Sequence, residues 1–137
     1  MKRKIFLSLF LILIIISGII VIYNKFYKID LSPYNYTFHG EMVDSPNNKY
    51  EIRIEILKLD EDSDEAYIMG LLVEKIYIEP NKTLISNKNT KIIYWDKVNA
   101  SDINDNLVGV IWLDDTTIKI SDKVLNINSD MYDYRRI

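Results

Sequence analysis

Apolar residues are almost continuous near the start of the chain and alternate with polar ones farther on. Residues 5–23 contain no charged side chain, and only Ser8, Ser17 and Gly18 interrupt their run of large apolar residues. At about 1.5 Å per residue these positions form a helix of roughly 28 Å, close to the ~30 Å of bilayer hydrocarbon. A helix in a soluble core would show a polar face, and this one has none. The pattern therefore predicts a transmembrane helix over residues 5–23.

The sequence after this helix favours an anchor that is retained. A cleaved signal peptide needs small residues just before the cleavage site, and residues 23–28 offer none. A lipid-anchored precursor would need a cysteine, and the chain contains no cysteine. Tyr23, Phe26 and Tyr27 suit the headgroup region, where aromatic rings collect at the membrane interface. We therefore expect an uncleaved signal anchor, with the lipid bilayer as its partner.

Basic residues predict the orientation of this anchor. Three of them precede the helix within residues 1–4, whereas Lys25 and Lys28 follow it. Because basic flanks stay on the cytoplasmic side, we expect residues 1–4 in the cytoplasm and the remainder outside. The expected localisation is the cell membrane, as a single-pass protein with an extracytoplasmic C-terminal domain.

The middle of the chain shows the two-residue period of β-strands. Residues 50–56 alternate between apolar and charged side chains, after a turn at residues 45–48 in which Pro and Asn favour turn conformations. Residues 67–73 repeat the alternation, but the apolar parity changes before Ile76. A β-bulge near residues 74–75 would absorb this change. The pattern predicts two long strands joined by an acidic turn.

Strands continue toward the C-terminus. Residues 91–95 form one candidate strand, and residues 108–113 and 116–120 flank Asp114-Asp115 as a hairpin that leads into residues 123–127. A short helix is expected only within residues 99–106. Successive strands with short turns predict a mainly β fold: an antiparallel meander, as a small sandwich or a rolled sheet, behind one N-terminal transmembrane helix. We expect a juxtamembrane segment over residues 24–44 and the extracytoplasmic β domain over residues 45–137.

Charge is unevenly distributed between the anchor and the domain. Residues 30–137 hold all 20 acidic residues but 12 of the 17 basic ones, which gives a net charge of −8 against −3 for the whole chain. A domain of this charge is repelled by polyanions. Nucleic acid is therefore excluded as a partner.

Side chains suited to catalysis or metal binding do not form a recognisable motif. His39 is the single histidine, and no nucleophile motif lies near it. Asp60, Asp62 and Asp64 have the alternate spacing of a calcium loop, but Leu71 stands where the bidentate Glu of that loop is needed. A solvated hairpin turn explains the acidic run more simply. We expect no catalytic residue, no metal site and no cofactor.

Aromatic residues in the strands are the remaining candidates for function. Trp95 and Trp112 could line a ligand or polysaccharide groove together with Tyr94, Tyr132 and Tyr134. In strands of a small sheet, however, such residues usually serve packing, and we expect Trp112 to be a core residue. The C-terminal residues are the candidate interaction surface: Tyr132, Tyr134, Arg135 and Arg136.

Four sequence blocks resemble a family of small, uncharacterised, membrane-anchored proteins of Gram-positive bacteria. They are residues 45–50, 93–96, 111–120 and 132–136. Residues 59–69 depart from the neutral, Gly- and Thr-rich stretch of that family. The resemblance implies an architecture and a location but no activity.

Three hypotheses for function remain. The first is a non-catalytic binding module that contacts an envelope protein or a cell-wall component. The alternatives are an envelope enzyme, namely a carboxylate-based hydrolase, and an accessory subunit of a membrane complex.

Overall fold

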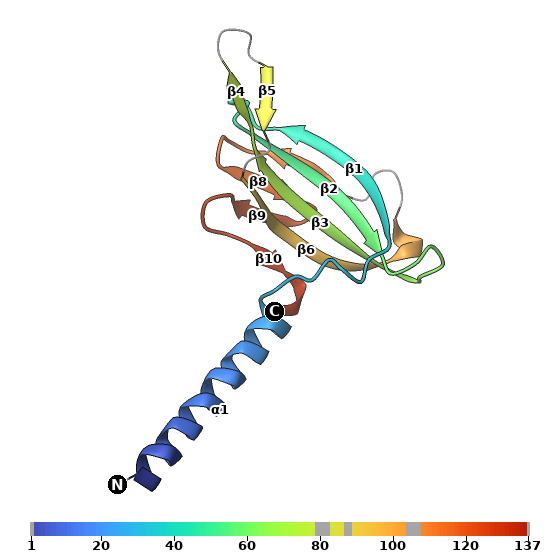
Figure 1. Ribbon diagram of the computed structural model, residues 1–137. Coiled ribbons are helices and arrows are strands. Elements are labelled where there is room, and N and C mark those ends of the chain that lie inside the picture. The colour runs from blue at the N-terminus through green and yellow to red at the C-terminus, as the bar shows by residue number, and fades with distance from the viewer. Residues whose placement is uncertain (1, 79–82, 87–88, 104–107, 137) are drawn as a thin grey trace. The chain divides into compact units, whose positions relative to one another are not determined.

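The protein consists of one long helix followed by a β domain (Figure 1). The computed structural model describes the chain except for residues 1, 79–82, 87–88, 104–107 and 137. Two compact units are formed, one by residues 1–32 with Arg136 and the other by residues 33–135. The elements are α1 (Lys2–Phe26), β1 (Tyr36–Asp44), β2 (Tyr50–Lys58), β3 (Glu65–Glu74), β4 (Ile76–Ile78), β5 (Thr83–Ser86), β6 (Thr90–Asn99), η1 (Ala100–Asp102), β7 (Val110–Trp112), β8 (Thr117–Ile120), β9 (Lys123–Asn126), β10 (Tyr132–Asp133) and η2 (Tyr134–Arg136).

Helix α1 is apolar on all sides. Its stretch Phe6–Lys25 comprises 20 residues, and every one of these side chains is exposed. The hydroxyl of Ser17 donates a hydrogen bond to the Leu13 carbonyl at 2.8 Å, so this polar group is satisfied within the helix. At about 1.5 Å per residue the stretch is close to 30 Å long. The helix is therefore long and apolar enough to cross a membrane, and the predicted N-terminal apolar helix is confirmed.

A five-stranded sheet forms the larger layer of the β domain, with the strand order β1-β2-β3-β6-β10. Its pairs are antiparallel except for the short parallel pair of β6 with β10. Strand β1 lies within residues 24–44, where we expected only a juxtamembrane segment. A bulge between His39 and Met42 changes the parity of this strand, so that Phe38 and Val43 pair with Ile56 and Ile52 on one face. Because of this change, the apolar residues of β1 do not recur at every second position, so the sequence pattern did not reveal the strand.

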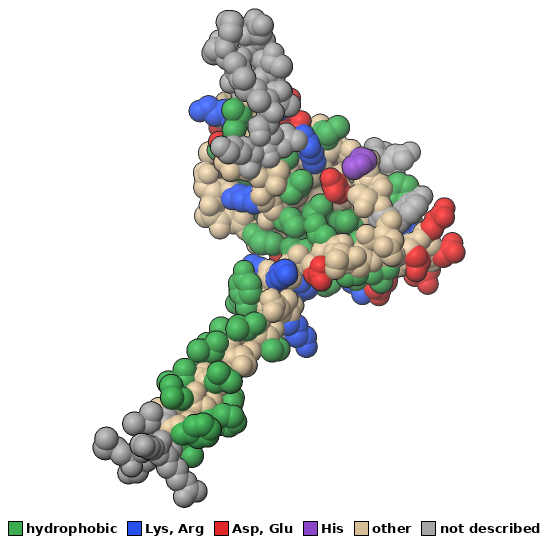
Figure 2. Space-filling model, in the orientation of Figure 1, with side chains coloured by type: hydrophobic (Ala, Val, Ile, Leu, Met, Phe, Trp, Pro, Cys, Tyr) green, Lys and Arg blue, Asp and Glu red, His purple; other side chains and the backbone are tan. Residues whose placement is uncertain are grey.

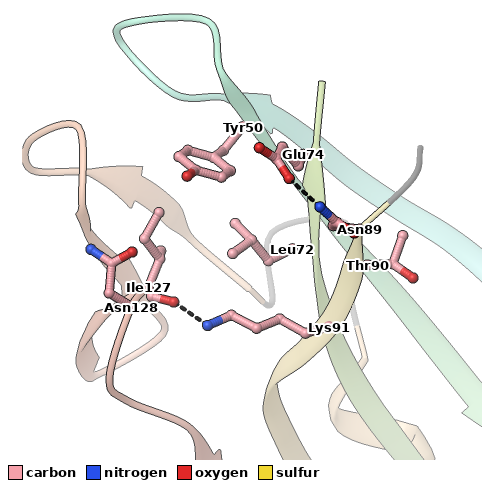
Figure 3. Close-up of a pocket in the computed structure, with 8 residues that line it drawn as sticks. All are labelled: Tyr50, Leu72, Glu74, Asn89, Thr90, Lys91, Ile127 and Asn128. Atoms are coloured by element: carbon pink, nitrogen blue, oxygen red, sulfur yellow. Dashed lines mark hydrogen bonds between the residues drawn. The ribbon is translucent and has the colours of Figure 1, made fainter. Parts of the chain in front are cut away.

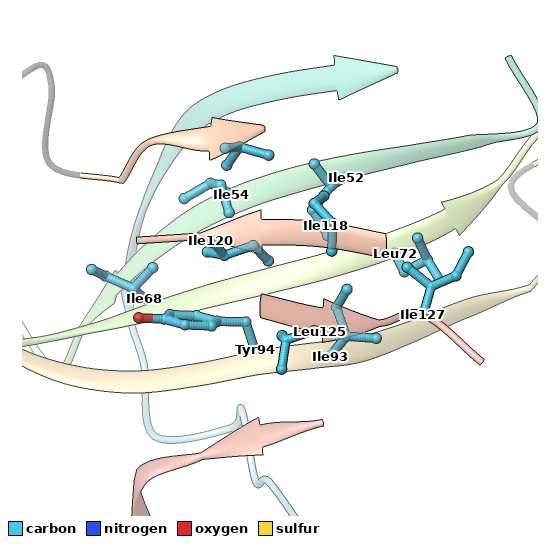
Figure 4. Close-up of a cluster of buried hydrophobic side chains, with 11 residues drawn as sticks. Ile52, Ile54, Ile68, Leu72, Ile93, Tyr94, Ile118, Ile120, Leu125 and Ile127 are labelled. Atoms are coloured by element: carbon cyan, nitrogen blue, oxygen red, sulfur yellow. The ribbon is translucent and has the colours of Figure 1, made fainter. Parts of the chain in front are cut away.

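Strands β7, β8 and β9 form a three-stranded antiparallel meander that covers one face of the larger sheet. Inward side chains of the two sheets meet in one hydrophobic core (Figure 4). Ile52 and Ile54 from β2 meet Ile118 and Ile120 from β8 there, and each is at most 3% exposed. The fold is thus the predicted mainly β, antiparallel-rich structure.

The turn from β1 to β2 is held by side-chain hydrogen bonds. The Ser45 hydroxyl donates to the Asn47 side-chain oxygen at 2.9 Å and accepts the Tyr50 amide at 3.0 Å. Asn48 takes a left-handed conformation (φ 58°), which asparagine tolerates well. The Lys75 ammonium donates to the Asn48 side chain at 2.9 Å and also to Asp44. This turn is therefore connected to the end of β3.

Of two expectations about neighbouring segments, one is wrong and the other is confirmed. The predicted bulge at residues 74–75 is wrong, because β3 ends at Glu74 and β4 belongs to a separate two-stranded sheet with β5. The Lys75 amide instead bonds the Lys49 carbonyl at 2.8 Å. A short helical turn does occur within residues 99–106, as η1, although residues 104–107 lie outside the described part.

Candidate functional site

The candidate site is the face of the five-stranded sheet that points away from the core, which we call the outer face. Residues that pair directly across strands share a face. The register therefore places Met42, Arg53, Leu71 and Ile92 in one row across four strands. Met42 is 64% exposed, Leu71 and Ile92 are half-buried, and Arg53 is ion-paired with Glu51. An antiparallel sheet with one face on a core usually has a polar second face. This row, which we call the apolar row because three of its four side chains are apolar, is therefore unusual.

Four aromatic side chains gather at one end of the outer face, and we call them the aromatic cluster: Tyr34, Tyr67, Trp95 and Tyr134. The Tyr67 and Trp95 rings stack at 5.5 Å, and Tyr34 meets their edges at 5.0 and 5.8 Å. The Tyr134 ring lies 6.4 Å from Tyr67. Trp95 is only 2% exposed, whereas the three tyrosines are half-buried. The tyrosines thus cover Trp95 and form the surface of the cluster.

The hydroxyls of Tyr34 and Tyr67 have raised pKa values. Burial, together with the neighbouring Tyr67 and Tyr134, raises the pKa of Tyr34 to about 12. Burial also raises the pKa of Tyr67, whose hydroxyl donates to a Glu65 carboxylate oxygen at 3.4 Å. Tyr34 and Tyr67 therefore present neutral rings and hydroxyl groups at neutral pH.

Asp133 and Arg135 hold the C-terminal strand beside the cluster. Asp133 is 3% exposed and pairs in parallel with Trp95. The Arg135 guanidinium donates two hydrogen bonds to the Asp133 carboxylate, at 2.6 and 2.9 Å, and the Arg135 amide adds a third at 3.1 Å. These bonds raise the pKa of Arg135, which stays charged. A bidentate pair of this kind fixes the geometry of both side chains.

Charged side chains border the apolar part of the outer face. Lys97 donates to Glu65 at 2.6 Å, and this bond lowers the pKa of the Glu65 carboxyl. His39 Nδ1 lies 3.9 Å from a Glu55 carboxylate oxygen. Figure 2 shows hydrophobic side chains gathered on this face of the domain next to His39. The outer face is therefore an apolar area with a border of polar and charged side chains.

The structure divides the C-terminal residues that the sequence suggested as one interaction surface. Tyr134 and Arg135 lie at the outer face, whereas Tyr132 packs at 5.1 Å against the core residue Tyr94. Arg136 groups with the helical unit rather than with the β domain. Only the first two therefore belong to the candidate site.

Sequence reasoning missed the contribution of Tyr34 and Tyr67. Tyr34 precedes the first strand, and Tyr67 lies on β3. A usable signal was present: residues 66–73 are apolar at both parities, with Ala66, Ile68 and Leu72 on the inner face. A strand with apolar side chains on both faces is usually covered by other side chains on both faces, which was a signal that side chains such as those of Tyr34 and Tyr67 cover the outer face.

The other candidate groups stay dispersed. Asp60, Asp62 and Asp64 are exposed in the turn between β2 and β3, and His39 is exposed on β1. In the described part of the chain, no three His, Asp or Glu side chains are grouped as metal ligands would be.

Comparison with known proteins places the chain in a family. The model of the family of unknown function DUF5412 matches residues 1–137. The chain belongs to this family. No curated protein and no solved structure matches it. DUF5412 membership carries no assigned activity, so the function has to be argued from the outer face.

Proposed function

We propose that this protein is a membrane-tethered, non-catalytic binding module whose outer face contacts a protein partner in the cell envelope. The observation that carries the proposal is the row of Met42, Arg53, Leu71 and Ile92, in which three of the four side chains are apolar, on a sheet face that the core does not use. In this proposal α1 is an uncleaved, single-pass signal anchor in the cell membrane, with its N-terminus in the cytoplasm.

The chemistry of the outer face favours a protein over a cell-wall glycan. Sugars stack on exposed aromatic rings, and Trp95, the largest ring here, is 2% exposed. The tyrosine rings that cover it are themselves half-buried, and the most accessible apolar side chain of the row is that of Met42, a thioether that is 64% exposed. Protein interfaces combine such an apolar centre with a polar, solvent-accessible rim, and the pair of Lys97 with Glu65 and the neighbouring His39 and Glu55 supply that rim.

The tether restricts where the partner is met. Residues 27–35 connect α1 to β1. Nine residues extend to at most about 30 Å. A domain on so short a connection stays close to the membrane surface, which suits a partner that is itself in or on the membrane.

Site-specific photocrosslinking in intact cells tests this proposal. A photoreactive amino acid at Leu71 or Met42 should yield one discrete crosslinked protein band, because both positions lie in the apolar row. The same residue at Val124, which is 55% exposed on the three-stranded sheet, is the matched control and should yield none. Equal crosslinking from all three positions, or none from the outer face, would contradict the proposal.

A further inference from the structure

A cavity opens at one end of the β domain between the two sheets (Figure 3). Its volume is about 180 Å³. Bulk water occupies about 30 Å³ per molecule, so this space corresponds to roughly six waters. It is large enough for a compact organic molecule of a similar number of non-hydrogen atoms. It lies on the inner side of the five-stranded sheet and is therefore distinct from the outer face.

The cavity has an apolar floor. Leu72 and Ile127 are 5% and 1% exposed and belong to the hydrophobic core. Tyr50, at the start of β2, packs against the same core. A ligand inside would therefore rest on apolar groups that the fold itself holds in place.

The rim of the cavity carries one carboxylate and one ammonium. Tyr50 pairs with Glu74 and Leu72 pairs with Lys91, so Glu74 and Lys91 are diagonal neighbours on one face. Diagonal neighbours in a sheet have Cβ atoms about 7–8 Å apart, which such long side chains can bridge. Even so, within the described part of the chain neither of them forms an ion pair.

Neutral partners hold the two charges apart. Asn89 donates to a Glu74 carboxylate oxygen at 2.6 Å, and the Lys91 ammonium donates to the Ile127 carbonyl. Figure 3 shows Leu72 lying between the two charged groups. An ammonium has three N–H donors and a carboxylate has two acceptor oxygens, so each group keeps bonding capacity beyond these contacts.

We propose that this cavity binds a small zwitterion of the α-amino-acid class. Lys91 receives the ligand carboxylate and Glu74 receives its ammonium group. Leu72, Ile127 and Tyr50 contact the short side chain. Opposite charges held apart above an apolar floor are what select a ligand that carries both charges and little bulk.

Binding measurements on the full-length protein in detergent micelles test the site. Alanine, as both enantiomers, is the probe, and ethylamine and propionate are matched probes that each lack one charged group. Titration calorimetry should show saturable binding of at least one alanine enantiomer, with each single-charge analogue at least tenfold weaker. Glu74→Gln and Lys91→Met should each weaken alanine binding at least tenfold while the thermal unfolding temperature stays unchanged.

Lys119→Met is the control variant, because Lys119 is exposed on β8 away from the cavity, and it should bind alanine like the parent protein. Absence of saturable alanine binding would overturn the proposal. So would equal affinity for ethylamine or propionate. Because cavity variants leave the outer face intact, crosslinking from Leu71 fails or succeeds independently of this result.

Discussion

At the scale of single residues, Trp112 connects the two sheets of the domain. We expected Trp112 to be a core residue, but its ring is half-buried and packs against the hydrophobic core, while Ile111 beside it is exposed. Its indole N–H also donates to the Val43 carbonyl on β1 at 3.2 Å. Trp112 therefore contributes both packing and a polar contact between β7 and an edge of the larger sheet.

Substitutions at Trp112 should separate these two contributions. Trp112→Ala should lower the free energy of unfolding by about 3 kcal/mol, near the lower end for aromatic-to-alanine changes because the ring is only half-buried. Trp112→Phe keeps most of the packing and loses one hydrogen bond, so about 1 kcal/mol is expected. Urea unfolding of the full-length protein in micelles measures both. Equal losses in the two variants would show that packing is not the larger part of the contribution of Trp112 to stability.

Asp133 should depend on Arg135 for its burial. Arg135→Met leaves a buried carboxylate without its guanidinium partner, which should cost about 3 kcal/mol of unfolding free energy. Lys97→Met is the matched control, because its pair with Glu65 is exposed, and it should leave stability unchanged. The double variant Asp133→Asn with Arg135→Met should recover part of the loss. Urea unfolding in micelles is the measurement, and a stable Arg135→Met protein would contradict the role of the pair.

Tyr34 should make the domain sensitive to alkaline pH. Its pKa is raised to about 12 in the folded state, against about 10 in an unfolded chain. Between these values the unfolded chain releases the proton and the folded one retains it. The contribution of Tyr34 to the free energy of unfolding is therefore fully present below pH 10 and is lost as pH rises toward 12. In Tyr34→Phe the thermal unfolding temperature should fall less steeply over this range. An identical pH profile in both proteins would refute the assignment.

At the scale of strands, the close packing of β3 on β6 depends on Gly70. A Cβ at this position would lie 2.8 Å from the Tyr94 Cβ and 3.3 Å from Ile120 Cδ1. Gly70→Ala should therefore destabilise the domain by about 1–3 kcal/mol, as overpacked cores do. Gly109→Ala is the control, since a Cβ there would meet nothing within 4 Å. Thermal unfolding monitored by circular dichroism distinguishes them, and similar melting temperatures for both would contradict this packing.

Local sequence patterns predicted the strands that pair regularly through local turns. They missed the features of the sheet that depend on contacts between distant parts of the chain. The hairpin of β7 and β8 was visible in sequence because Asp114 makes its turn locally, by accepting the Thr116 and Thr117 amides at 2.7 and 2.8 Å. Strand β1 was missed because its bulge reverses the parity of apolar positions.

The candidate site was harder to predict than the strands. The aromatic cluster joins Tyr34 to residues 67, 95 and 134, and no local period relates positions so far apart. Tyr134 and Arg135 were suggested as candidate interaction residues only because of their residue types near the C-terminus. Their arrangement follows from the parallel pairing of β10 with β6, which a pattern of short antiparallel turns does not suggest.

At the scale of the whole molecule, we expect α1 to span the membrane, with residues 1–4 in the cytoplasm and the β domain outside. In intact cells without a wall, external protease should digest the domain, and the mature protein should still begin at or near Met1, because residues 23–28 lack a cleavage site. Immunoblotting and N-terminal sequencing measure these outcomes. A protected domain would contradict the orientation, and a mature terminus beyond Tyr23 would contradict the retained anchor.

The separation of the two core layers along the chain has a consequence for biogenesis. Strands β1, β2, β3 and β6 come from residues 36–99, whereas the layer that covers them comes from residues 110–126. A chain that emerges in order therefore exposes the inner side of the first strands before their cover has been synthesised. Such long-range closure folds slowly, and the uncovered strands are prone to aggregate meanwhile. If α1 spans a membrane, it would hold this nascent intermediate at the membrane surface until the last strands arrive.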